Sequence, residues 1–465
     1  MGRILNIWRG WSRNQRLVFV GSLVTVVAGG AVAAYLLLKR DSDVGCPPPC
    51  ALEVEAEPVE EPKKEAKRLN WPVYGYTDQR TRYFPTKKVK PPYAASRWSF
   101  NAGTLLEFSP VLVDDRLYIV DKNAVAYALD ARKGKVLWKR DVGGLSAASP
   151  AFADGRLFVV SLEPGDVQAL NPRNGKVLWE RDLGARSETS PVIFRDKVIV
   201  GNESGTVFAL DVKTGNTEWS VDSAGAVKGG VAIDDGHVYF GNYAGEVFSI
   251  DAKNGEVKWQ TGTQGGSFGR TGRIYSTPTV GYGRVYLGSI DSRVYSFNQE
   301  DGSLAWSQST GAEVYSGPAL AETPGAPATV FIGSADKYFY ALDARTGAIR
   351  WKQFTEGIIL GAASVIGDVA YVGIIGPMNG TIGYDAKTGK EVFRHDLGEY
   401  NPAITDGHWL YLTGASILRA FPPELSKKQK AKQRRETRQR AADRRAEEAA
   451  GETPSEEDGT PEPQE

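Results

Sequence analysis

Short runs in which apolar and polar residues alternate fill most of the chain and predict β-strands. Residues 206–210 (TVFAL) and 284–288 (RVYLG) are typical, because β-branched and aromatic residues dominate them and Gly, Asp and Asn bound them. One apolar run is much longer: residues 17–38 number 22 and carry no charge. That length suffices for a helix that crosses about 30 Å of hydrocarbon. The pattern therefore predicts an all-β domain that follows one transmembrane helix.

Seven segments of eleven residues repeat along the chain without gaps. In each, an Asp or Asn is followed four residues later by Gly, and after four more by Trp or, once, Phe. The segments are ALDARKGKVLW (128–138), ALNPRNGKVLW (169–179), ALDVKTGNTEW (209–219), SIDAKNGEVKW (249–259), SFNQEDGSLAW (296–306), ALDARTGAIRW (341–351) and GYDAKTGKEVF (383–393). Their aromatic ends lie 40 to 47 residues apart, which is the period of a four-stranded propeller blade.

The residue types of the repeat predict a β-hairpin turn followed by an aromatic residue that packs against the next blade. The Asp or Asn accepts hydrogen bonds from turn amides, and the Gly supplies a positive φ angle. The aromatic residue that follows is large enough to cover the neighbouring blade. We therefore expect a docking role for Trp98, Trp138, Trp179, Trp219, Trp259, Trp306, Trp351 and Phe393.

The ends of the repeat array predict how the ring closes. After Phe393, residues 401–423 supply three strand-like segments and then reach two prolines, so the eighth blade lacks one strand. Upstream, residues 97–103 resemble residues 137–143, and Trp98 precedes Trp138 by 40 positions. An N-terminal strand is thus expected to complete the last blade and remove the free edges. The predicted fold is an all-β, eight-bladed β-propeller of four-stranded blades.

The segments around the propeller have a distinct composition. Four arginines precede the apolar run and two basic residues follow it, which favours a cytoplasmic N-terminus and an extracytoplasmic propeller at the cell membrane. A cleaved signal peptide, ending near Ala31-Val32-Ala33, is the alternative. The expected parts are a cytoplasmic basic segment (1–16), a transmembrane helix (17–38), a stalk (39–70), the propeller (71–423), a basic helical tail (424–446) and an acidic disordered tail (447–465).

Composition excludes several classes of site. The net charge is zero, so no global electrostatic partner is implied, and nucleic acid is not expected. The two cysteines, Cys46 and Cys50, lie in the stalk, where three intervening prolines would hold them about 12 Å apart. That spacing is too long for a disulfide between the two, so each cysteine is expected either to form an interchain disulfide or to remain a free thiol. His237, His395 and His408 have no metal-ligand spacing, and we expect no catalytic, cofactor or metal site.

The repeat resembles the PQQ-type propeller repeat, whose signature A-x-D-x-x-T-G-x-x-x-W is matched best at residues 209–219 and 341–351. The resemblance covers the chain from about Trp71 to Pro423. That family contains large quinoprotein dehydrogenases, which hold pyrroloquinoline quinone and calcium, and smaller anchored BamB-like proteins, which bind partners in outer-membrane protein assembly. The anchor and the lack of an added domain resemble the second group.

The resemblance implies a protein-interaction scaffold in the cell envelope and not an enzyme. The dehydrogenases carry adjacent cysteines over the cofactor and a calcium cluster, whereas residues 71–423 contain no cysteine. Two alternatives stay open: a sensor that binds a quinone or sugar in the central funnel, and a PQQ-dependent oxidoreductase.

Insertions into the minimal blade predict where a partner would bind. Residues 263–274, 374–380 and 162–166 lengthen connections that open on one face of a propeller, whereas residues 321–329 lie on the other face. Inserted loops are free to serve binding, and aromatic and Arg residues dominate interfaces. The candidate partner-binding residues are Phe268, Arg270, Arg273 and Met378. Glycine-rich loops without a partner are the alternative.

Overall fold

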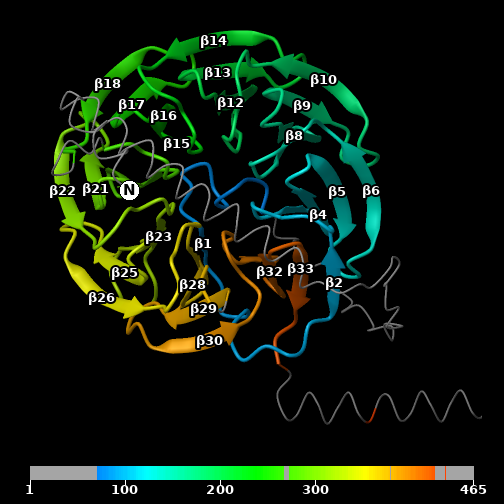
Figure 1. Ribbon diagram of the computed structural model, residues 1–465, viewed down its shortest axis with the longest axis vertical. Helices are drawn as coiled ribbons and strands as arrows, with labels where there is room; N and C mark the ends of the chain where they lie inside the picture. The colour runs from blue at the N-terminus through cyan, green and yellow to red at the C-terminus, as the bar shows by residue number, and fades with distance from the viewer. Residues whose placement is uncertain (1–70, 266–271, 378, 425–434, 436–465) are drawn as a thin grey trace, which may run out of the picture. The chain divides into compact units, whose positions relative to one another are not determined.

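The structure, a computed structural model, describes residues 71–265, 272–377, 379–424 and 435, all within the compact unit Lys63–Glu465. Strands in these residues form eight sheets that are arranged as the blades of a ring around a central channel (Figure 1). Each blade has four antiparallel strands from the channel to the rim, and one sheet carries a fifth, parallel strand at the channel. The predicted eight-bladed, all-β architecture is therefore confirmed.

The strands occupy four concentric positions in the ring. The innermost are β3 (Val111–Val113), β7 (Ala151–Ala153), β11 (Val192–Phe194), β15 (Ala232–Asp234), β19 (Thr279–Gly281), β23 (Ala319–Ala321), β27 (Ser364–Ile366) and β31 (Ile404–Thr405). The second are β4 (Arg116–Val120), β8 (Arg156–Val160), β12 (Lys197–Gly201), β16 (His237–Gly241), β20 (Arg284–Ser289), β24 (Thr329–Gly333), β28 (Val369–Ile374) and β32 (Leu410–Gly414). The third are β5 (Val125–Asp130), β9 (Asp166–Leu170), β13 (Thr206–Asp211), β17 (Glu246–Asp251), β21 (Arg293–Asn298), β25 (Tyr338–Asp343), β29 (Gly380–Asp385) and β33 (Ile417–Phe421). The outer strands are β6 (Val136–Asp141), β10 (Val177–Asp182), β14 (Thr217–Asp222), β18 (Val257–Gly262), β22 (Leu304–Ser309), β26 (Ile349–Phe354), β30 (Glu391–His395) and β2 (Trp98–Asn101).

The meander gives the ring two different faces. The connections between blades and the turns between second and third strands open on one side, which we call the connection face. The turns between first and second strands, and between third and fourth, open on the other side, the hairpin face. The predicted transmembrane span (17–38) and both predicted tails, apart from Glu424 and Arg435, lie outside the described residues. Within the part of the chain that the structure describes, no helix is long and apolar enough to cross a membrane.

A β-bulge precedes the aromatic residue that ends each of the seven repeats. In the first blade Ala128 pairs with Trp138 but Leu129 pairs with Val136, which leaves Leu137 as an extra residue of β6. The same shift separates the third and outer strands of the six following blades. Because a bulge re-aims the side chain beside it, the aromatic residue turns toward the next blade.

Each repeat Trp docks on the hairpin turn of the following blade. The indole Nε1 of Trp138 donates to the Pro172 carbonyl at 3.0 Å. Its ring covers Gly175, whose φ is +70° and where a Cβ would lie 2.8 Å from the ring. Seven tryptophans donate such a bond at 2.9–3.2 Å. Phe393 has no N–H to donate and instead packs edge-on against Tyr93 and Tyr371.

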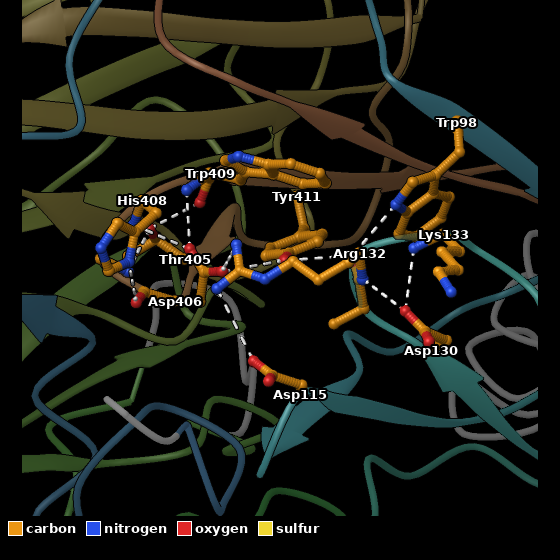
Figure 2. Close-up of polar contacts among 12 residues, drawn as sticks. Trp98, Asp115, Asp130, Arg132, Lys133, Thr405, Asp406, His408, Trp409 and Tyr411 are labelled. Carbon is orange, nitrogen blue, oxygen red and sulfur yellow. Dashed lines mark hydrogen bonds and ion pairs between the residues drawn. The ribbon is translucent and has the colours of Figure 1, made fainter. Parts of the chain in front are cut away.

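The N-terminal strand β2 closes the ring by pairing with β33, from Trp98 opposite Ala420 to Asn101 opposite Ile417, as the sequence predicts. A polar cluster secures this seam on the hairpin face (Figure 2). Arg132 pairs with the buried Asp406 at 2.9 Å and with Asp115 at 3.6 Å, and its guanidinium lies 5.2 Å from the ring centroid of Trp409. Main-chain pairing thus joins the N-terminal strand to the last blade, and the Arg132–Asp406 ion pair joins the last blade to the first.

A segment that the repeats do not predict fills the channel. Residues 71–84, which we call the channel segment, lie at the centre of the ring in blue (Figure 1). Its backbone exchanges hydrogen bonds with the innermost strands of six blades, at Leu112, Phe152, Ile233, Val280, Leu320 and Val365. Its last residues form β1 (Tyr83–Phe84), which adds to β27 in parallel. The channel segment therefore holds blades together from the inside.

Candidate functional site

A cavity of about 220 Å³ lies at the centre of the connection face. The blades contribute to its wall at one equivalent position, the fourth residue before each innermost strand. Seven of these residues line the cavity: Glu107, Glu188, Lys228, Tyr275, Tyr315, Leu360 and Tyr400. Tyr74 of the channel segment lines it as well. The repeat fixes the backbone at this position, so the identity of each side chain is free to define a site.

Two glutamates and one lysine form an ion-pair network on one side of the cavity. The Lys228 ammonium lies 2.7 Å from carboxylate oxygens of both Glu188 and Glu203. Burial alone would lower the pKa of Lys228, but the bonds to these two carboxylates outweigh it and raise the pKa. The Tyr275 hydroxyl donates to the second oxygen of Glu188 at 2.8 Å. The charge of Lys228 is therefore already satisfied within the protein.

Glu107 is a second carboxylate in the lining, two blades away from Glu188. Burial first, and the charge of Glu188 second, raise the pKa of Glu107, while Lys122 opposes them. The lining thus contains two carboxylates and one ammonium. Burial and Glu188 thus disfavour the charged form of Glu107, which a positive charge in the cavity would favour.

Aromatic rings form the rest of the wall. The ring centroids of Tyr243 and Tyr275 are 6.4 Å apart, and those of Tyr275 and Tyr315 are 6.1 Å apart. Burial raises the pKa of Tyr243 to about 12 and also raises the pKa of Tyr315, so both remain neutral phenols at physiological pH. On the channel side, Phe108 packs edge-on against Tyr74 at 6.0 Å.

Two fully buried arginines hold the channel segment in place. Arg80 donates to the carbonyls of Val231, Ser190 and Pro191 at 2.8–3.0 Å and also to that of Tyr74. Burial first, and Arg82 second, lower the pKa of Arg80 to about 9, against the opposing effects of Asp78 and Tyr74. The guanidinium thus stays charged at neutral pH.

Arg82 is bonded to the protein through one end of its guanidinium. Its Nη1 donates to the Arg80 and Pro318 carbonyls and to the Thr279 hydroxyl, each at 2.8 Å. Among the described residues, Nε and Nη2 of Arg82 find no hydrogen-bond partner.

Only part of the predicted partner-binding set can be placed. Arg273 is exposed on the connection face, with its guanidinium 5.9 Å from the ring centroid of Tyr243 at the edge of the cavity. Phe268, Arg270 and Met378 lie outside the described residues. The inserted turn at 162–166 pairs with the blade connection through Leu145 and Glu163, and the turn that begins at 374 does so through Ile358 and Ile375. Both turns thus lie on the connection face.

An exposed aromatic cluster lies on the same face, and sequence reasoning missed it. Phe354 ends β26 with 54% of its surface exposed. Its ring lies 5.5 Å from that of Tyr338, over which Lys352 places its ammonium at 4.7 Å. Tyr282, which is 58% exposed, lies on the opposite, hairpin face in the turn between β19 and β20.

Comparison with known families identifies the repeat array. A family model described as outer membrane protein assembly factor BamB matches residues 87–224, 205–420 and 335–451, which together cover most of the chain. The chain belongs to this family. Membership confirms the BamB-like, PQQ-type repeat that the sequence indicates.

Two curated alcohol dehydrogenases match short parts of the chain. The chain is 36% identical over 76 residues to 1-butanol dehydrogenase (cytochrome c) of Thauera butanivorans and 34% identical over 77 residues to quinohemoprotein alcohol dehydrogenase ADH-IIG of Pseudomonas putida. Each match covers 15–16% of this chain and 11% of the relative. The chain therefore matches only a small part of the length of these curated relatives.

Solved structures of a BamB protein and of an alcohol dehydrogenase share the propeller fold. BamB from Moraxella catarrhalis aligns with a TM-score of 0.59 and 19% identity, over 70% of this chain and 99% of that one. Quinohemoprotein alcohol dehydrogenase from Comamonas testosteroni aligns with a TM-score of 0.61 and 14% identity, over 77% of this chain and 81% of that one. At these identities the likeness establishes the fold alone.

Proposed function

We propose that this chain is a membrane-anchored, extracytoplasmic propeller that serves as a scaffold for protein partners in the cell envelope. The observation that carries the proposal is the match of the BamB family model across the repeat array. The uncharged run at residues 17–38, with its excess of arginines before it, supports the anchor and the orientation. A role in the assembly of outer-membrane proteins is the form of scaffold that the family description suggests.

The connection face is the proposed partner surface. It carries the exposed Phe354, the inserted turns and Arg273. Exposed aromatic and Arg side chains contribute most of the binding energy at protein interfaces.

An oxidoreductase with pyrroloquinoline quinone is a weaker candidate, because the cavity residues do not fit that cofactor. The cofactor is a tricarboxylate, whereas the lining has two carboxylates and one ammonium that two glutamates already hold. The volume of about 220 Å³ is also below the roughly 300–1,000 Å³ of pockets for drug-sized ligands. Among the described residues, no three His, Cys, Asp or Glu side chains are grouped to hold a metal ion.

Affinity purification of the full chain from membranes of its own organism tests the scaffold function. The informative variant is Phe354→Ser, and the matched control is Tyr282→Ser, which removes an equally exposed ring from the hairpin face. We expect Phe354→Ser to lose the captured partner and Tyr282→Ser to retain it. Equal capture by both variants would reject the connection face, and recovery of no partner by the unmodified chain would reject the scaffold.

A further inference from the structure

We propose that the central cavity is a binding site for a small organic cation, an alkylammonium or guanidinium group. Aromatic ring faces attract cations through their quadrupole, and rings that surround a charge form the cages that recognise quaternary ammonium groups. Six aromatic side chains line this cavity, four of them tyrosines from the blades: Tyr74, Phe108, Tyr243, Tyr275, Tyr315 and Tyr400. This wall suits a cation better than a polycarboxylate.

The carboxylates of the lining also favour a bound cation. Glu107 and Glu188 line the cavity from blades on either side of the blade whose equivalent residue is the small Ala147. Lys228 is held by Glu188 and Glu203, whereas Glu107 is opposed only by the charge of Lys122, which does not line the cavity. Arg80 and Arg82 carry charge nearby, but both are fully buried against the ring of Tyr74 and neither lines the cavity.

The molecule already places two of its own cations near one of these rings, that of Tyr243. The Lys228 ammonium lies 5.7 Å and the Arg273 guanidinium 5.9 Å from the ring centroid of Tyr243. Both distances are within the range of about 6 Å over which a ring attracts a cation. The volume of about 220 Å³ limits the ligand to one headgroup or one side chain.

Two sources could supply such a group. One is a free amine, and the other is a Lys or Arg side chain that a bound protein inserts into the cavity. The second source rests on the proposed scaffold function, whereas the cavity chemistry does not.

Calorimetric titration of the full chain in detergent with choline tests the site. The matched control ligand is 3,3-dimethyl-1-butanol, which has the shape of choline without its charge. We expect choline to bind saturably and the alcohol to bind at least about tenfold more weakly, because aromatic rings attract a desolvated cation but not a neutral alkyl group. Equal binding of the two ligands, or no binding of choline, would overturn the proposal.

Variants locate the site and separate it from folding. Glu107→Gln keeps the shape and removes the charge, and Tyr315→Leu removes one ring; each is expected to weaken choline binding about 2- to 30-fold. Glu300→Gln, an exposed substitution on the hairpin face, is expected to leave it unchanged. Weakening by all three variants alike, or by none, would contradict the assignment. Thermal melting of each variant verifies that the propeller is intact.

Competition distinguishes the two sources. Saturating choline is added to the chain with its captured partner. Release of the partner supports an inserted Lys or Arg side chain, and retention of the partner together with choline binding supports a free amine. A partner that is captured while choline fails to bind overturns the cation site and leaves the scaffold function standing.

Discussion

Replacing Arg80 by Ala tests whether the channel segment stabilises the ring. The guanidinium is fully buried and donates to four main-chain carbonyls, three of which belong to two blades on the channel wall. The substitution removes all four bonds at once and leaves a void between the segment and the blades.

The expected loss follows from these contacts. Each buried carbonyl left without a donor costs about 1–3 kcal/mol. The substitution also removes a buried charge and its desolvation penalty, which offsets part of this loss. We therefore expect Arg80→Ala to lower the free energy of unfolding by about 3 kcal/mol. Arg80→Lys keeps the charge but has three donors instead of five, so its loss should be smaller.

Urea unfolding of the full chain, followed by tryptophan fluorescence at pH 7, measures these losses. Arg345→Ala is the control, because Arg345 is an exposed residue of a hairpin turn and such changes stay within about 0.5 kcal/mol. Limited proteolysis of residues 71–93 in Arg80→Ala should increase in parallel. If Arg80→Ala and Arg345→Ala unfold at the same urea concentration, the channel segment does not stabilise the ring.

Three further predictions concern the blades. Trp219→Ala should cost about 3–5 kcal/mol of unfolding free energy and Trp219→Phe only about 1 kcal/mol, since Phe loses the indole hydrogen bond but keeps the ring; equal losses would show that burial of the ring contributes nothing. Gly215→Ala should destabilise more than Gly184→Ala, because both have φ above +70° but only the first would place a Cβ 2.6 Å from the ring of Trp179; thermal melting compares them, and equal melting temperatures would exclude the contact as the cause. Burial lowers the pKa of His395, so the unfolded chain binds this proton first and stability should fall as pH drops below the ordinary value of 6.5. His395→Gln should reduce that slope in unfolding measured from pH 7.5 to 5.5, and an unchanged slope would assign it to other groups.

Much of the ring could be predicted from the sequence, because each blade repeats the same local chemistry. Asp130 accepts hydrogen bonds from the Arg132 and Lys133 amides at 2.8 and 2.9 Å, and Gly134 has a φ of +68°, as the motif predicts. The bulge before each aromatic residue was not predicted, because the repeat shows which residues recur and not how they pair across the hairpin.

The channel segment and the cavity could not be found by the same means. The channel segment has no periodicity, and Tyr76, Arg80 and Arg82 adopt positive φ angles that non-glycine residues rarely take. Arginines are also mostly exposed, so burial of two of them is not expected from their type. The cavity residues occupy the same position in each blade, four residues before the innermost strand, but differ in type, as Glu188 and Tyr315 do. Such differences change no loop length, so the inserted loops do not reveal them.

The pairing of β2 with β33 also determines when the ring can close during folding. Ser99 and Arg419, which face each other across it, are separated by 320 positions in the chain. Pairing over such a separation makes folding slow, and until it occurs both strands present unpaired edges that favour aggregation. During synthesis the closing strand is made before any complete blade and stays unpaired until the last blade has formed. Until the last blade has formed, the propeller is therefore an open arc of blades with an unpaired strand edge at each end.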